Sequence, residues 1–193
     1  MALRPRILVL LVLALAAMAS TPAALGRGGN YVFDGGTHAQ RTQVRKALAA
    51  SSFDWGIVPK QVTIHIERGV DSHASRGEIW LDARLLDSGR FSWGVVQHEY
   101  AHQVDFSLLN DGNRAQLQGL LGAKAWCTDT PGLDHTDYGC ERFASTLAWA
   151  YWQNDENCIK PTSKRDESAG MPPAAFRSTL AAMLNLPVVR RAR

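Results

Sequence analysis

The distribution of apolar and polar positions predicts a chain in which strands and helices are mixed. Residues 61–67 alternate apolar and polar side chains and are rich in β-branched residues, which is typical of a half-buried strand. Residues 77–82 follow a loop and predict a second, short strand. His65 lies on the polar side of the first strand, so we interpret it as a solvated or hydrogen-bonded histidine rather than a metal ligand.

Five other segments carry the spacing of amphipathic or buried helices. Thr37 is an N-cap candidate for a helix that reaches Ala50, and Ser92 is one for a long helix from Trp93 to about Leu109. The remaining predicted helices are a polar one over 114–121, a buried one over 143–152 and an amphipathic one over 173–184. The sequence contains no internal repeat and no linker between two cores, so we expect one α+β domain.

The first 19 residues have the pattern of a signal peptide. Arg4 and Arg6 provide a positive start, residues 7–19 contain no charge, and residues 17–19 offer a small-x-small cleavage pattern. Pro22 interrupts the uncharged run before it reaches the ~20 apolar residues of a membrane-spanning helix. We therefore expect a secreted protein without stable membrane insertion after signal cleavage. An uncleaved anchor, which would keep the protein at the cell surface, is the alternative.

Three regions follow from these patterns. Residues 1–19 form the predicted signal peptide, and residues 20–35, which include a glycine-rich stretch, form a flexible N-terminal segment. Residues 36–193 form the single domain. The chain has 21 Lys and Arg against 18 Asp and Glu, but the signal peptide removes two arginines and no acid. The folded body is then close to neutral, which argues against a nucleic-acid partner because such partners need a basic face.

The cysteine count limits the disulfides that the chain can form. All three cysteines lie in the exported part, where thiols can oxidise, and an odd number allows at most one intramolecular disulfide. A helix from Cys140 to about Gln153 would be about 20 Å long at 1.5 Å per residue, a distance that four further residues barely span. We therefore expect Cys127 to pair with either Cys140 or Cys158.

The candidate metal-binding and catalytic residues lie in the segment His98-Glu99-Tyr100-Ala101-His102, inside the predicted long helix. A separation of four residues puts His98 and His102 on one helix face, one turn apart. Two neutral imidazoles in this arrangement can occupy two corners of a tetrahedral zinc site. Glu99 lies about 100° around the helix from His98, where it can act as a general base without ligating the metal. The pattern predicts a zinc site and a hydrolytic reaction.

The five residues 98–102 resemble the signature of the zincin metallopeptidases. The metzincin branch would continue with glycine at position 105 and histidine at position 108, whereas this chain has Asp105 and Leu108. A gluzincin takes its third ligand from a glutamate on a later helix. Glu141-Arg142-Phe143-Ala144 resembles the Glu-x-Phe-Ala segment of lethal-factor-like and minimal gluzincins, and Glu141 is 39 residues beyond His102. The resemblance therefore implies that zinc binds His98, His102 and Glu141.

Two departures from the gluzincin pattern leave alternatives open. Thermolysin-like members have an aspartate four residues after the ligand glutamate, where this chain has Ser145, so Asp105 or Asp137 would have to support a ligand histidine. Residues 132–139 also partly resemble the Gly-Thr-x-Asp-x-x-Tyr-Gly segment of aspzincins. In that alignment His135 stands where the ligand aspartate should be. Alternatives to Glu141 as third ligand are therefore Asp134, Asp137 and His135.

The resemblance also implies a fold and roles for further residues. It implies a zincin-like domain with a small sheet, in which residues 78–81 form the edge strand to which a peptide substrate adds. Tyr138 and His135 are the expected donors to a tetrahedral oxyanion, beside the general base Glu99. The expected function is a secreted zinc peptidase. The alternatives are a secreted zincin-fold binding protein without turnover and a zinc amidase that acts on a cell-wall component.

Overall fold

The computed structural model describes residues 28–127 and 130–186. The predicted signal peptide and the basic C-terminal end fall outside these residues. In the described part, no helix combines the length and the apolar character needed to cross a bilayer.

The fold is α+β, as predicted, with four strands and six helices in the residues described. In chain order they are β1 Tyr31–Gly35, α1 His38–Ala50, β2 Val62–Glu67, β3 His73–Ser75, β4 Glu78–Asp82, α2 Ala83–Asp87, α3 Trp93–Leu108, α4 Asp111–Leu121, α5 Gly139–Tyr151 and α6 Pro173–Met183.

The sheet is mixed and has the strand order β1-β2-β4-β3. Strand β2 pairs in parallel with β1 and with β4, and β3 closes one side by pairing antiparallel with β4. The two predicted strands correspond to β2 and β4. The prediction that residues 78–81 form the sheet edge is wrong, because the three-residue strand β3 covers that side of β4. On this side of the sheet the edge strand is therefore β3, His73–Ser75.

The predicted flexible segment over residues 20–35 is wrong for its last five residues. Tyr31–Gly35 forms strand β1, which pairs with β2 along its whole length. Two glycines with positive φ then turn the chain into α1, and a Cβ on Gly36 would come within 2.8 Å of the Ile66 side chain. Thr37 caps α1 as predicted, in a capping box with Gln40. The sheet thus begins earlier in the chain than the sequence pattern indicated.

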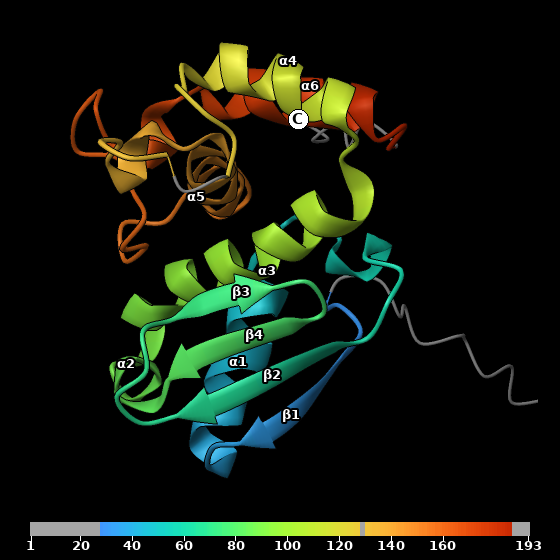
Figure 1. The fold of residues 1–193 in the computed structure, drawn as a ribbon. Coiled ribbons are helices and arrows are strands. Elements are labelled where there is room, and N and C mark those ends of the chain that lie inside the picture. Colours follow the sequence, from blue (N-terminus) through green and yellow to red (C-terminus); the bar gives the residue numbers. More distant parts are fainter. Residues whose placement is uncertain (1–27, 128–129, 187–193) are drawn as a thin grey trace, which may run out of the picture.

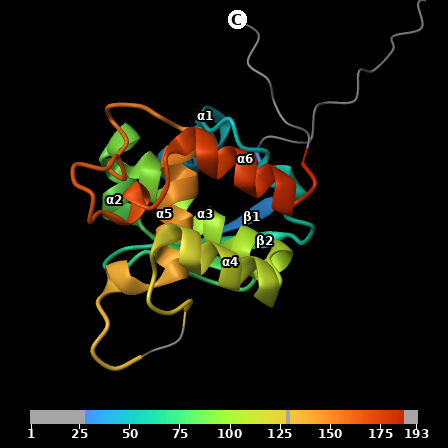
Figure 2. The ribbon, with the colours of Figure 1, turned by 90° about the horizontal axis from the view of Figure 1, so that it is seen from above.

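Alternating side chains of the central strands build the core on one face of the sheet. Ile64 of β2 and Ile79 of β4 are buried there together with Leu48 of α1 and Val104 of α3. Figure 1 shows α1 behind the sheet and α3 alongside the edge strand β3. On its other side, α3 packs against α5. The view from above shows α4, α5 and α6 over α3, so α3 lies between the sheet and this second layer (Figure 2).

Helix α3 begins differently from the prediction. Ser92 was expected to cap it, but a 3-10 turn over Gly89–Ser92 leads directly into the helix, and the Ser92 hydroxyl donates to the Gly89 carbonyl instead. The helix is buried without interruption from Val96 to Asp105. Helix α5 begins at Gly139, four residues before the predicted start at Phe143. The buried stretches of α3 and α5 both contain polar side chains, which thus lie in the interior of the protein.

Gln103 ties α3 to the hairpin formed by β3 and β4. Its side-chain amide donates to the carbonyls of Ser75 (2.7 Å) and Glu78 (3.0 Å), and the Gly77 N–H donates to its Oε1 (2.8 Å). Because Gln103 is 1% exposed, its amide depends on these three hydrogen bonds for its partners. The residue next to His102 thus fixes the edge strand to the helix.

We expect the Gln103→Ala substitution to lower the free energy of unfolding by about 2–4 kcal/mol, because it removes three hydrogen bonds between α3 and the hairpin and truncates a buried side chain. Urea unfolding followed by circular dichroism measures the change. Gln116→Ala on the exposed side of α4 is the matched control, expected to change stability by less than about 0.5 kcal/mol. Equal effects of the two substitutions would contradict this role of Gln103.

Candidate metal centre

The two histidines of the motif lie side by side on the face of α3 that points toward α5. Their ring centroids are 4.9 Å apart and their Nε2 atoms 3.2 Å apart, as expected for residues one helical turn apart. His98 is 7% exposed and His102 is 6% exposed. Two imidazole nitrogens therefore face the same point in a largely dry environment.

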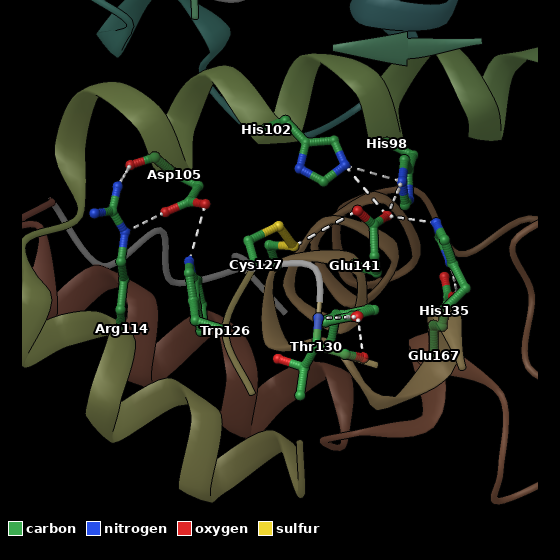
Figure 3. Close-up of a disulfide and its surroundings, with 12 residues drawn as sticks. His98, His102, Asp105, Arg114, Trp126, Cys127, Thr130, His135, Glu141 and Glu167 are labelled. Atoms are coloured by element: carbon green, nitrogen blue, oxygen red, sulfur yellow. Dashed lines mark hydrogen bonds and ion pairs between the residues drawn. A yellow bond between two sulfur atoms is a disulfide. The ribbon is translucent and has the colours of Figure 1, made fainter. Parts of the chain in front are cut away.

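Glu141 approaches this point from the first turn of α5. Its Oε2 lies 3.1 Å from Nε2 of His98 and 3.4 Å from Nε2 of His102, and Figure 3 shows the three side chains converging. Ligand atoms at the corners of a tetrahedron lie about 3.3 Å apart when each is 2.0–2.1 Å from a central zinc. The three separations match the edges of such a tetrahedron. His98, His102 and Glu141, called the His/His/Glu cluster below, thus form a group that could hold a metal ion.

The cluster is held together by opposite charges when no metal is bound. Burial opposes ionisation of Glu141, but hydrogen bonds with His102 and His98 outweigh it and hold the pKa of Glu141 well below its usual range. Burial likewise disfavours the charged form of His102, yet the hydrogen bond to Glu141 raises its pKa. The ionised carboxylate and the raised pKa of His102 both favour a proton between the two side chains, and a metal ion would take the place of that proton.

Glu99 lies beside the two histidines and is almost fully buried. Its carboxylate belongs with them to a set of ligand-type atoms that lie within 4.8 Å of one another. Burial raises the pKa of Glu99, although the neighbouring His98 and His102 act in the opposite direction. A buried carboxyl whose pKa is raised is suited to accepting and returning a proton near neutral pH. This is the position that the motif predicted for a general base.

His98 is supported by residues that the sequence did not identify. Its Nδ1 is 3.0 Å from the Ser145 hydroxyl, which donates to Oε2 of Glu167 at 2.8 Å. Glu167 opens a 3-10 turn over Glu167–Ala169 in the C-terminal part of the chain. Ser145 and Glu167 therefore orient the ring of His98. The prediction that Asp105 or Asp137 supports a ligand histidine is not met.

Both aspartates have other partners. Asp105 is 1% exposed and accepts from Arg114 Nε (2.8 Å) and Trp126 Nε1 (3.1 Å), which joins α3 to α4 and to the segment before the disulfide (Figure 3). Asp137 lies near the surface and accepts from Lys124 at 3.0 Å, the contact that lowers its pKa most. Among the described residues, neither carboxylate forms a hydrogen bond or ion pair with His98 or His102, although the charge of Asp105 helps to raise the pKa of His102.

The loop before α5 brings one of the two predicted oxyanion donors to the cluster. His135 points its Nε2 at Glu141 Oε2 (3.3 Å), and its Nδ1 lies 2.6 Å from Oε1 of Glu167. Burial lowers the pKa of His135, but the hydrogen bond to Glu167 and the charge of Glu141 outweigh this and raise it. The Tyr138 hydroxyl instead exchanges hydrogen bonds with the backbone of Thr130 (3.0 and 3.3 Å). Its catalytic role stays a prediction.

A disulfide anchors the same loop next to the cluster. Cys127 pairs with Cys140, which confirms one of the two predicted pairings, and Cys158 keeps a free thiol. Cys140 directly precedes Glu141, and its sulfur lies 3.5 Å from Glu141 Oε1. The cross-link therefore fixes the start of α5, and with it the ligand-type carboxylate. A disulfide of this kind is consistent with an extracellular protein.

No family model, curated protein or solved structure matches the chain. The chemistry of this centre therefore rests on its own residues and distances. What these establish is the His/His/Glu cluster with an adjacent buried carboxylate at Glu99. The cluster could hold a metal ion.

We expect Glu141→Gln to weaken zinc binding by more than the ~10–100-fold typical of residues that only support a ligand, because it removes the carboxylate that completes the cluster. Competition with a chromogenic chelator measures the affinity. Asp137→Asn, four residues earlier on the loop, is the matched control and should bind zinc as the wild type does. Loss of zinc in Asp137→Asn with retention in Glu141→Gln would refute this assignment.

Proposed function

We propose that the protein is a secreted zinc-dependent peptidase with a zincin-like catalytic domain. The observation that carries the proposal is the convergence of His98 and His102 with Glu141, at separations that suit a tetrahedral ion. Two imidazoles and one carboxylate are a ligand set typical of catalytic zinc, which leaves the fourth position open. When bound there, zinc supplies a Lewis acid that acidifies water and polarises a carbonyl group.

Glu99 is proposed as the general base of the reaction. It follows His98 directly, lies beside both ligand histidines, and is buried at 5% exposure. In this role its carboxylate removes a proton from the attacking water and then delivers that proton to the leaving amine. Burial raises its pKa, which favours this two-way transfer over permanent ionisation.

The edge strand β3 is proposed to receive the peptide substrate. It lies at one side of the sheet, alongside α3, and the backbone of its hairpin is fixed to Gln103 of that helix. An extended peptide can add to such an edge through main-chain hydrogen bonds. This arrangement would align a peptide bond with the His/His/Glu cluster, because Gln103 is adjacent to His102 in the helix.

His135 is proposed to contact the developing oxyanion. Its Nε2 faces Glu141 from the loop, while Glu167 engages its Nδ1, so the ring presents one nitrogen to the reacting groups. The side chain is 67% exposed and thus lies on the solvent side of the cluster, where a substrate would arrive. A donor in this position stabilises negative charge that develops on the carbonyl oxygen.

We expect purified wild type loaded with zinc to cleave casein, and Glu99→Gln to lower kcat about 10²–10⁴-fold while zinc stays bound. The amide keeps the shape of the side chain but cannot take up a proton. Release of acid-soluble peptides measures turnover, and metal analysis measures zinc content. Glu67→Gln at the exposed end of β2 is the matched control, expected to retain full activity.

Two outcomes would count against the peptidase. Equal inertness of wild type and Glu99→Gln, with zinc bound to both, would favour a binding protein without turnover. Hydrolysis of muropeptides but not of casein would favour an amidase that acts on cell-wall material. The same panel of substrates therefore separates the three functions.

A further inference from the structure

Glu167 has a position that neither the motif nor the proposed reaction accounts for. It lies in the C-terminal part of the chain, 26 residues beyond Glu141, yet its side chain lies beside the His/His/Glu cluster, next to His135 (Figure 3). Each of its two carboxylate oxygens has a separate partner there. Oε1 lies 2.6 Å from Nδ1 of His135, and Oε2 accepts the Ser145 hydroxyl at 2.8 Å.

We propose that Glu167 is a positioning residue that orients a metal ligand and His135 at the same time. This rests on the proposed metal site. Two sets of hydrogen bonds start at its carboxylate. The first, called the first arm below, runs through Ser145 to His98, and the second arm runs directly to His135. One carboxylate thereby fixes the orientation of the His98 ring relative to the His135 ring.

The direction of the hydrogen bonds in the first arm follows from the chemistry of its members. An ionised carboxylate only accepts, so the Ser145 hydroxyl must donate to Glu167. The Ser145 oxygen then has lone pairs left to accept the Nδ1–H of His98, 3.0 Å away. When a metal is bound, His98 in this tautomer offers the ion the lone pair of Nε2, the atom that faces His102 and Glu141, in place of the Nε2–H that otherwise hydrogen-bonds to Glu141. This is the form of imidazole that binds a metal.

The second arm acts on His135 in the same manner. The Glu167 carboxylate accepts from Nδ1, which turns Nε2 toward Glu141 at 3.3 Å. His135 belongs to a short 3-10 turn on the loop before α5 and is mostly exposed. Within the described residues, the contacts of its ring nitrogens are with Glu141 and Glu167 only. Without Glu167, the ring would lose the partner that sets its orientation.

The backbone around Glu167 is held by contacts that do not involve its carboxylate. The Thr146 hydroxyl of α5 donates to the Glu167 carbonyl at 3.3 Å, and the buried Ser168 hydroxyl donates to the Ile159 carbonyl at 2.6 Å. A change confined to the Glu167 carboxylate therefore leaves the turn in place. Effects of such a change report on the two arms rather than on loss of the fold.

The test measures zinc affinity of the full chain by chelator competition, together with the visible absorption bands of bound Co²⁺. We expect Glu167→Gln and Ser145→Ala each to weaken zinc binding about 10–100-fold and to alter the Co²⁺ bands. The double substitution should weaken it no further than Glu167→Gln alone, because both changes break the same arm. His135→Ala should leave zinc affinity within about twofold of wild type, since it breaks only the other arm.

Glu156→Gln is the matched control, because Glu156 lies in the same C-terminal part but pairs with Arg90 at the surface. It should bind zinc as the wild type does. Circular dichroism of the metal-free proteins checks that all variants fold, and Ser145→Ala provides an independent break of the first arm. Wild-type affinity and Co²⁺ bands in folded Glu167→Gln would overturn the proposal. Failure of the wild type to cleave casein would refute the peptidase alone, because affinity and not turnover is measured here.

Discussion

The burial of helix α3 is the constraint on which the rest of the structure depends. From Val96 to Asp105 the helix has no exposed side, yet six of these ten residues are polar. Buried polar groups are costly unless they are paired, so the surrounding elements must supply partners in fixed places. The β3–β4 hairpin meets Gln103, α4 supplies Arg114 to Asp105, and α5 supplies Glu141 to the two histidines. The layers above and below α3 are thus arranged by hydrogen bonds as well as by apolar packing.

The burial of α3 also explains why the side chains of the candidate metal centre are held in fixed positions. Its candidate ligands come from two helices that pack along each other, and α5 carries Glu141 one residue after a disulfide-bonded cysteine. The first helix turn of α5 is therefore fixed covalently and by packing. Behind it, Ser145 and Glu167 extend the network away from the cluster. Along this network each polar group has a partner, so the interior around the cluster contains few unpaired polar groups.

The sequence allowed prediction of what depends on local spacing. His98 and His102 share a helix face because they are four residues apart, and β2 alternates because one of its faces is buried. Glu141, in the first turn of α5, was singled out through the Glu-x-Phe-Ala resemblance alone. Strand β3 was missed because three residues show no usable period, and β1 because it lies in a glycine-containing segment. Glu167 follows no spacing rule, because a turn in the C-terminal part of the chain brings it to the cluster. The one indication in the sequence was Ser145, which stands where thermolysin-like gluzincins have an aspartate, so that the ligand histidine needed a different hydrogen-bond partner.

The distance along the chain between the candidate ligands has a consequence for folding. The disulfide closes a loop with a sequence separation of 13, whereas His102 and Glu141 are 39 residues apart. A metal ion shared by α3 and α5 would act as a second, reversible cross-link over a longer loop, and restricting a longer loop removes more conformational entropy from the unfolded chain. Since the ligands meet only in the folded chain, free metal would favour that state by mass action. The fraction of molecules that are folded would then rise with the concentration of free metal.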